Sequence, residues 1–177
     1  MKYTETRVKG VVILEFEPIT DERGFFARAW DEQEGATRNM PLKSLQCNTS
    51  LSLRQGTVRG MHYQEKPHAE AKLVRCTRGA VYDVALDVRR DSPTYRTWVA
   101  VELTPDNYRM LYIPEGCAHG FQTLADTTEV FYQMSEYFHP ESARGVRFDD
   151  PAFAIEWPEA QARTMSDKDR SYPDWVV

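Results

Sequence analysis

The residue types best suited to chemistry gather in one short stretch, residues 59–64 with the sequence RGMHYQ, which Lys72 follows. Histidine has an ordinary pKa close to neutrality, so His62 could act as a general base. The planar guanidinium of Arg59 suits phosphate oxygens, and the ammonium of Lys72 offers a compact charge for a developing oxyanion. A lone histidine is more often structural than catalytic, so this stretch predicts a reactive site only together with further polar residues.

Two other strand-like segments carry polar side chains that could complete such a site. Gln46 and Asn48 lie in a polar run shortly before the histidine stretch. Because buried amides need hydrogen-bond partners, this run indicates a polar pocket wall, with an exposed edge strand as the alternative. Tyr132 shares a two-residue period with Val130 and Met134, which places the three side chains on one inward face. It is therefore either a packed core tyrosine or a proton donor that lines a cavity.

Two short polar motifs near the ends of the chain each have a structural and a functional interpretation. Residues 21–26 (DERGFF) form a polar turn that runs into two aromatic residues. This is either a turn before a buried strand, or a loop in which Arg23 binds a phosphate and a phenylalanine packs on a flat ring. Residues 166–169 (SDKD) have the pattern of a capped turn, which is ordinarily a solvated surface.

The elements that must position these residues are short β-strands. Residues 11–16 (VVILEF) are apolar apart from Glu15 and begin with three β-branched residues, and Pro18 ends the run. From residue 73 onward apolar residues alternate with a period of two. Turn-forming residues separate the alternating runs, and there is no long amphipathic helix. The pattern predicts an all-β antiparallel sandwich or barrel. It also predicts a short helix or loop in residues 31–45 and a proline-bounded segment, residues 151–158, packed on the barrel.

Length and composition indicate one domain over residues 1–177 and narrow the classes of function. Hydrophobic residues make up 41% and charged residues 28%, which is typical of globular proteins. The net charge of -5 argues against a nucleic-acid-binding surface. The 3 cysteines form neither a CxxC pair nor an even disulfide framework. No apolar run approaches the ~20 residues of a membrane span. We therefore expect a reduced, cytoplasmic protein that binds neither nucleic acid nor membranes.

Residues 113–121 (IPEGCAHGF) contain Pro-x-Gly-x-x-His, which resembles the second conserved motif of the cupin superfamily. In metal-binding cupins this histidine, here His119, is a ligand together with an earlier His-x-His pair and a carboxylate. That earlier pair is missing, because no two of the 4 histidines are separated by a single residue. We therefore expect no metal site.

Taken together, the motifs resemble one cupin family, the nucleotide-sugar 3,5-epimerases typified by dTDP-4-dehydrorhamnose 3,5-epimerase. The matches run in order through nearly the whole chain. They are Asp21–Phe26, Gln46-x-Asn48, Arg59–Gln64, Lys72–Cys76, Gly79–Val84, Ser92–Thr94, Ile113–Phe121, Ile155–Pro158 and Ser166–Asp169.

The resemblance implies a cofactor-independent enzyme with a cupin jelly-roll β-barrel and short C-terminal helical segments. It implies a nucleotide-sugar substrate and a homodimer with exchanged N-terminal strands, in which the strand around residues 12–16 pairs with the partner subunit. His62 would be the base and Asp169 its partner, while Tyr132 would be the acid on the opposite face of the sugar and Lys72 would face the C4 carbonyl. The residues expected to line the substrate site are Arg23, Phe26, Arg28, Gln46, Asn48, Arg59, His119, Phe138 and Lys168.

Four residues depart from those common in this family, namely Arg28, Cys47, Phe138 and Ala143. By the resemblance, they lie toward the end of the substrate site that would bind the nucleotide. They therefore leave the predicted reaction type unchanged and the identity of the nucleobase open. A carboxylate at position 28 could accept the N3–H of thymine, whereas the guanidinium of Arg28 could donate to the acceptors of cytosine or simply pair with Asp31. We expect conversion of dTDP-4-dehydro-6-deoxyglucose to dTDP-4-dehydrorhamnose. A CDP-linked sugar, or inversion at C3 or C5 alone, is the alternative.

Three more distant interpretations remain open at the level of the sequence. One is a metal-dependent cupin isomerase or dioxygenase, which stoichiometric iron or zinc would reveal. Another is a sugar-nucleotide-binding or seed-storage-like barrel, which would bind ligand without exchanging its protons with solvent. The third is a 3,4-ketoisomerase, which would change the constitution of the sugar rather than its configuration.

Overall fold

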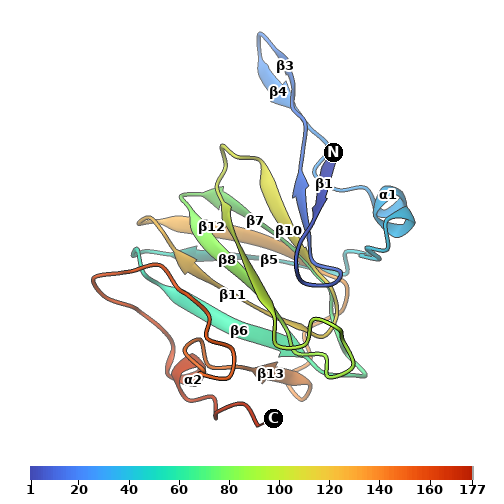
Figure 1. Ribbon diagram of the computed structural model, residues 1–177. Coiled ribbons are helices and arrows are strands. Elements are labelled where there is room, and N and C mark those ends of the chain that lie inside the picture. The colour runs from blue at the N-terminus through green and yellow to red at the C-terminus, as the bar shows by residue number, and fades with distance from the viewer. Residues whose placement is uncertain (177) are drawn as a thin grey trace.

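Two antiparallel β-sheets packed face to face form the body of the protein, in a computed structural model that describes residues 1–176 (Figure 1). The larger sheet has the order β1 (Lys2–Glu5), β2 (Val12–Glu15), β10 (Arg109–Ile113), β7 (Lys72–Arg78), β12 (Thr128–Met134) and β5 (Gln46–Ser52). The smaller has the order β13 (Ala143–Gly145), β6 (Val58–Gln64), β11 (Cys117–Thr123), β8 (Val81–Asp87) and β9 (Trp98–Leu103). β3 (Ile19–Asp21) and β4 (Gly24–Phe26) form a separate hairpin. The two helices described are α1 (Glu32–Thr37) and α2 (Asp167–Arg170).

The main core lies between the two sheets and follows from the alternation of apolar residues in the strands. Val74 of β7 and Val130 of β12 are buried there against Ala85 of β8 and Phe121 of β11. Side chains on successive strand residues point to opposite faces, so every second residue reaches this layer. The predicted all-β architecture, with only short helices, is confirmed.

The smaller sheet also buries its outer face, under the C-terminal part of the chain. Phe153 is buried against a cluster that includes Val84 and Leu86 of β8, and Trp157 packs against its edge. The indole N–H of Trp157 donates to the carbonyl of Phe148 over 2.7 Å, which satisfies the one polar atom of that ring. The prediction that residues 151–158 pack on the barrel is confirmed.

The larger sheet is covered by the segment around α1. Asp31 caps this helix, because its side chain accepts a hydrogen bond from the N–H of Glu34. After the helix, Met40 and Leu42 are buried against Leu73 and other residues of the sheet. The short helix predicted in residues 31–45 is therefore present. None of the helices described here has the length and apolar character that crossing a membrane requires.

The N-terminal strands differ from the expectation in one respect. β2 is hydrogen bonded to β1 on one edge and to β10 on the other, both within its own chain. The prediction that residues 12–16 pair with a partner subunit is therefore wrong for this strand, because neither of its edges is free. The element that leaves the body of the chain is instead the β3–β4 hairpin, which projects at the top of Figure 1.

Candidate functional site

A cavity of about 710 Å³ opens between the two sheets, and most of the predicted site residues line it. They come from distant parts of the sequence and converge only through the fold. The predicted residues in the cavity wall are Gln46, Asn48, Arg59, His62, Lys72, His119, Tyr132, Phe138, Lys168 and Asp169.

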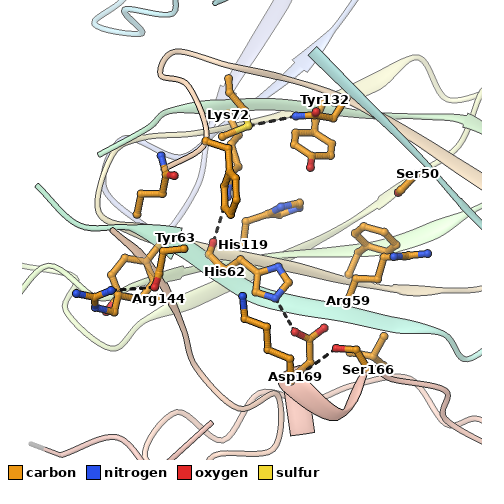
Figure 2. Close-up of a pocket in the computed structure, with 18 of the residues that line it drawn as sticks. Ser50, Arg59, His62, Tyr63, Lys72, His119, Tyr132, Arg144, Ser166 and Asp169 are labelled. Carbon is orange, nitrogen blue, oxygen red and sulfur yellow. Dashed lines mark hydrogen bonds and ion pairs between the residues drawn. The ribbon is translucent and has the colours of Figure 1, made fainter. Parts of the chain in front are cut away.

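His62 on β6 and Asp169 on α2 form a histidine–carboxylate pair in this wall (Figure 2). His62 Nε2 lies 2.7 Å from Asp169 Oδ1, and the other carboxylate oxygen accepts the N–H of Gly60 over 3.3 Å. Burial raises the pKa of Asp169, but the hydrogen bonds from His62, Gly60 and Ser166 outweigh it, and the net shift is below the ordinary value. An ionised carboxylate here fixes the ring orientation of His62 and stabilises its protonated form.

Local sequence explains how this pair is held. The side chain of Ser166 caps α2 by accepting the N–H of Asp169 over 3.1 Å, so the predicted capped turn is present. On β6, Gly60 has a φ of +116°, and a Cβ at this position would lie 2.5 Å from the Cα of Gly120 on β11. Only glycine allows this close approach of the two strands, which places His62 beside α2.

Lys72 reaches the cavity from β7 as part of a buried ion pair that we did not predict. Its Nζ lies 2.8 Å from Glu70 Oε1, and the two side chains are only 9% and 3% exposed. The ammonium also donates to the carbonyl oxygen of His62 over 3.2 Å, and Glu70 Oε2 accepts the N–H of Gln64 over 2.9 Å. The Glu70 carboxylate thus holds the Lys72 ammonium in place and balances its charge when no anionic ligand occupies the cavity.

A second histidine–carboxylate pair, also not predicted in full, lies deeper in the wall. His119 Nε2 is 2.8 Å from Oδ1 of Asp83, whose side chain is completely buried. In the pairing of β8 with β11, Asp83 is opposite Phe121. His119 is two residues before Phe121 and therefore on the same face of β11. The other oxygen, Asp83 Oδ2, has no hydrogen-bond partner among the described residues. This pair orients the His119 ring toward the cavity.

Tyr132 lies on the larger sheet, across the cavity from the His62–Asp169 pair (Figure 2). It packs beside the buried Val130 and Met134, as the alternation predicted. Burial raises the pKa of its hydroxyl, and the nearby carboxylate of Glu70 adds to this against the opposing effect of Arg59. Tyr132 is therefore a protonated phenol at neutral pH, able to donate a proton into the cavity.

Polar and cationic groups line the rest of the wall. Gln46 Nε2 donates to Asn48 Oδ1 over 3.2 Å, and Gln46 Oε1 accepts the N–H of Phe138 over 3.0 Å. β5 is also an edge strand of its sheet, so the polar run with Gln46 and Asn48 is both a pocket wall and an edge strand. Arg59 is oriented by hydrogen bonds to the side chain of Ser52 and to the backbone of β5, and it leaves a positive charge at the cavity.

Three predicted residues lie outside the cavity of their own chain. Arg23 is at the tip of the β3–β4 hairpin, where it pairs with Asp21. Phe26 on the same hairpin is 72% exposed. Arg28 pairs with Asp31 at 3.0 Å and is largely exposed, which is the arrangement given above as the alternative to a base contact.

The chain matches one family of known proteins over almost all of its length. The sequence pattern of the family described as dTDP-4-dehydrorhamnose 3,5-epimerase matches residues 5–176. A curated dTDP-4-dehydrorhamnose 3,5-epimerase of Sinorhizobium fredii is 41% identical over 173 residues, which are 98% of this chain and 89% of that protein.

Solved structures extend the match to the fold. The dTDP-4-dehydrorhamnose 3,5-epimerase of Bacillus anthracis, with TDP and PPi bound, superposes with a TM-score of 0.93 at 39% identity and covers 98% of this chain and 99% of that one. The epimerase of Legionella pneumophila in complex with dTDP-4-keto-L-rhamnose gives 0.90 at 33% identity, with 99% of each chain covered. The fold is thus the cupin-type jelly roll that the resemblance implied, and the chain belongs to the dTDP-4-dehydrorhamnose 3,5-epimerase family of isomerases.

Proposed function

We propose that this protein inverts C3 and C5 of a dTDP-linked 4-keto-6-deoxyhexose, converting dTDP-4-dehydro-6-deoxyglucose to dTDP-4-dehydrorhamnose. The observation that supports this best is the placement of His62 and Tyr132 on opposite sheets that face one cavity. Inversion of a carbon requires a proton to leave from one face and another to arrive on the opposite face. A base and an acid on opposite walls meet that requirement.

The C4 ketone makes the hydrogens on C3 and C5 acidic. His62 would remove one of them as a proton, and the electron pair of the C–H bond would form a C=C bond while the carbonyl oxygen becomes an enolate. Asp169 would stabilise the protonated His62 ring through the 2.7 Å contact. Lys72 would stabilise the enolate oxygen, an electrostatic contribution worth several kcal/mol in such sites.

Tyr132 would complete the inversion by donating its proton to the carbon from the other side. The enolate then collapses to the ketone with the opposite configuration. His62 would release its proton to solvent and Tyr132 would take one up from solvent before the sequence repeats at the second carbon. The hydrogen leaves and returns as a proton, so no electrons are gained or lost and the reaction itself requires no cofactor. Enclosure between the sheets limits the access of water to the enolate.

The nucleotide assignment rests on the relatives and on the cations of the site. Two similar structures contain TDP or a dTDP-sugar. In this chain Arg59 and Lys168 line the cavity, and neither has a carboxylate partner within 4.0 Å among the ion pairs of the described residues. Such cations suit the oxygens of a diphosphate.

We further propose a homodimer in which the β3–β4 hairpin extends into the cavity of the partner subunit. One face of the hairpin packs on its own chain, where Phe25 contacts Tyr108 with ring centroids 5.5 Å apart. The opposite face presents Ile19 and Phe26, which are cross-strand neighbours and are 71% and 72% exposed. An exposed apolar pair of this size favours burial against another chain, and Arg23 would then reach the partner's substrate.

One experiment tests the reaction directly. The protein is incubated with dTDP-4-dehydro-6-deoxyglucose in D2O, and NMR follows deuterium at C3 and C5 together with the configuration of each carbon. We expect incorporation and inversion at both positions. Inversion at one carbon alone would make the protein a monoepimerase, and a product with the keto group moved to C3 would reveal a ketoisomerase. Binding with no exchange would refute catalysis altogether.

The dimer is tested by sedimentation of the intact protein and of a variant that lacks residues 18–27. We expect the intact protein to sediment as a dimer and the deletion to lower kcat/KM for the dTDP-sugar. Phe26→Asp is the milder variant and should weaken association without removing any backbone. A fully active monomer in either case would contradict a shared site.

A further inference from the structure

Two histidines and a glutamate gather beside the cavity, outside the set of residues used for epimerisation. His68 lies in the loop between β6 and β7, and His139 and Glu141 lie in the loop between β12 and β13. The rings of the two histidines stack with centroids 3.5 Å apart and an angle of 8° between their planes. None of these three residues lines the substrate cavity.

The ligand atoms of this cluster lie near the spacing that a metal ion requires, and the two stacked rings must turn out of parallel for both in-plane lone pairs to point at one ion. His139 Nδ1 is 3.1 Å and His68 Nε2 is 3.9 Å from Oε1 of Glu141. In a tetrahedral zinc site with bonds of about 2.0–2.1 Å, the donor atoms are roughly 3.3 Å from one another, which lies between these two values. Within residues 1–176, this is the one group of three such side chains whose donor atoms all lie within 4.8 Å.

The backbone around the cluster is fixed by a single buried side chain. Gln64 Nε2 donates to the carbonyl of His68 over 2.8 Å and to that of Tyr137 over 3.1 Å. Its Oε1 accepts the N–H of His139 over 2.6 Å. Gln64 therefore holds the two loops together before any ion binds, which lowers the conformational cost of bringing the ligands together.

A second carboxylate lies behind one of the ligands. The other ring nitrogen of His139, Nε2, is 4.0 Å from Oε1 of Glu136. A histidine that binds a metal through one nitrogen commonly donates its other N–H to a carboxylate, and a small movement of the Glu136 side chain would form that bond. Arg144 does not neutralise the cluster, because it pairs with Glu65 at 2.9 Å.

We propose that His68, His139 and Glu141 bind one divalent transition-metal ion, with Zn²⁺ the best match, at the rim of the substrate cavity. Two imidazole nitrogens and one carboxylate oxygen favour zinc, nickel or copper over magnesium and calcium, which prefer oxygen ligands alone. Three protein ligands leave a fourth position for water. The ion would join the two loops and stiffen the one that carries Phe138, which lines the cavity. The absence of a His-x-His pair gave no sign of this site, because its ligands come from two separate loops.

The site is tested on the intact protein, freed of metal by a chelator and then titrated with Zn²⁺ by calorimetry. We expect one ion to bind per chain, and we expect His68→Ala, His139→Ala and Glu141→Gln each to weaken binding at least tenfold. Glu65→Gln is the matched control, because it changes a neighbouring carboxylate outside the cluster and should bind as the wild type does. Unaltered binding in all three cluster variants, or no saturable binding in the wild type, would overturn the proposal.

Two further measurements separate this site from the others that could take up zinc. His62→Ala should still bind one ion, since a Zn²⁺ held by the catalytic pair would be lost in that variant. Co²⁺ in place of Zn²⁺ should give a visible spectrum of nitrogen and oxygen ligands, whereas thiolate charge-transfer bands that vanish in Cys47→Ser would assign the ion to the exposed Cys47 instead.

The proposed stiffening has its own readout. Zn²⁺ should slow amide hydrogen exchange in residues 65–71 and 135–142 together, and it should leave the turn at residues 104–108 unchanged. The effect should disappear in His68→Ala, whose histidine belongs to only one of the two loops. Slower exchange confined to residues 135–142 would show that the ion does not join the loops, and it would refute the assignment of His68.

Discussion

His62 Nε2 lies 2.7 Å from Asp169 Oδ1, although the two residues are 107 positions apart in the chain. The contact joins β6, a strand of the smaller sheet, to a helix of only 4 residues near the C-terminus. A parallel bridge between Thr57 and Thr164 lies beside it and guides the C-terminal segment back to β6. The proposed base is therefore oriented by a C-terminal segment that packs beside β6.

Replacing the two members of this pair should affect the reaction to different degrees. His62→Ala should abolish deuterium incorporation at both C3 and C5, because proton removal precedes every later step. Asp169→Asn should retain some activity but lose orders of magnitude in kcat, as the loss of an orienting carboxylate does in comparable dyads. NMR in D2O measures both, and full activity in His62→Ala would end the mechanism.

Tyr132→Phe should separate exchange from inversion. The enolate can still form in this variant and can return a solvent deuteron on the His62 side. We therefore expect deuterium to enter the substrate faster than the epimer accumulates, which a single NMR time course reports. A parallel loss of the two rates would point to a structural tyrosine or to a proton donor elsewhere.

Asp169 should also make stability depend on pH. Its pKa in the folded protein is below its ordinary value of about 3.9, so its ionised form stabilises the folded state above that pH. This contribution is lost as the pH falls through the folded-state pKa. The difference in unfolding free energy between wild type and Asp169→Asn should therefore be largest above about pH 5 and shrink in more acidic solution. Urea denaturation at several pH values measures it, and a difference that grows with acidity would contradict the sign.

Glu70→Gln should destabilise the protein through Lys72. The amide still accepts the N–H of Gln64, but the buried ammonium loses its counter-charge, and we expect unfolding free energy to fall by about 3 kcal/mol. Lys72→Met combined with Glu70→Gln is the control, and it should recover part of that loss because no unpaired charge remains. Additive effects of the two changes would show that the pair is not coupled.

Arg28 allows a test of the nucleobase. If its guanidinium reads the base across a dimer interface, Arg28→Glu should shift the ratio of kcat/KM values for dTDP- and CDP-linked 4-keto sugars toward dTDP by about tenfold or more. The pair with Asp31 seen in this chain predicts an unchanged ratio instead. Steady-state kinetics with both substrates distinguishes the two outcomes, and Asp31→Asn controls for loss of the local ion pair.

The regular part of the fold could be predicted because alternation and capping are local. The inward placement of Tyr132 and the cap at Ser166 each depend on residues within a few positions, and the structure contains both. The ion pair of Glu70 with Lys72 also had a local signal, because residues two apart in an extended chain share a face.

Other features depend on which strands become neighbours, and a single sequence does not specify this. Asp83 meets His119 only because β8 lies beside β11, and β2 is closed on both edges only because β10 lies next to it. The stacking of His68 on His139 likewise needs two loops to meet at Gln64. Long-range pairing of this kind explains both the missed carboxylate and the wrong expectation for residues 12–16.

The projecting β3–β4 hairpin has a genetic consequence if it completes the partner's cavity. A subunit with a defective His62 and a subunit with a defective Phe26 would form mixed dimers in which one cavity has both defects and the other has neither. Two inactive alleles expressed in one cell would then restore each other's activity, up to about half of the sites in each mixed dimer. Whether a cell lacks the activity would then depend on the combination of two alleles that it expresses, and not on either allele alone.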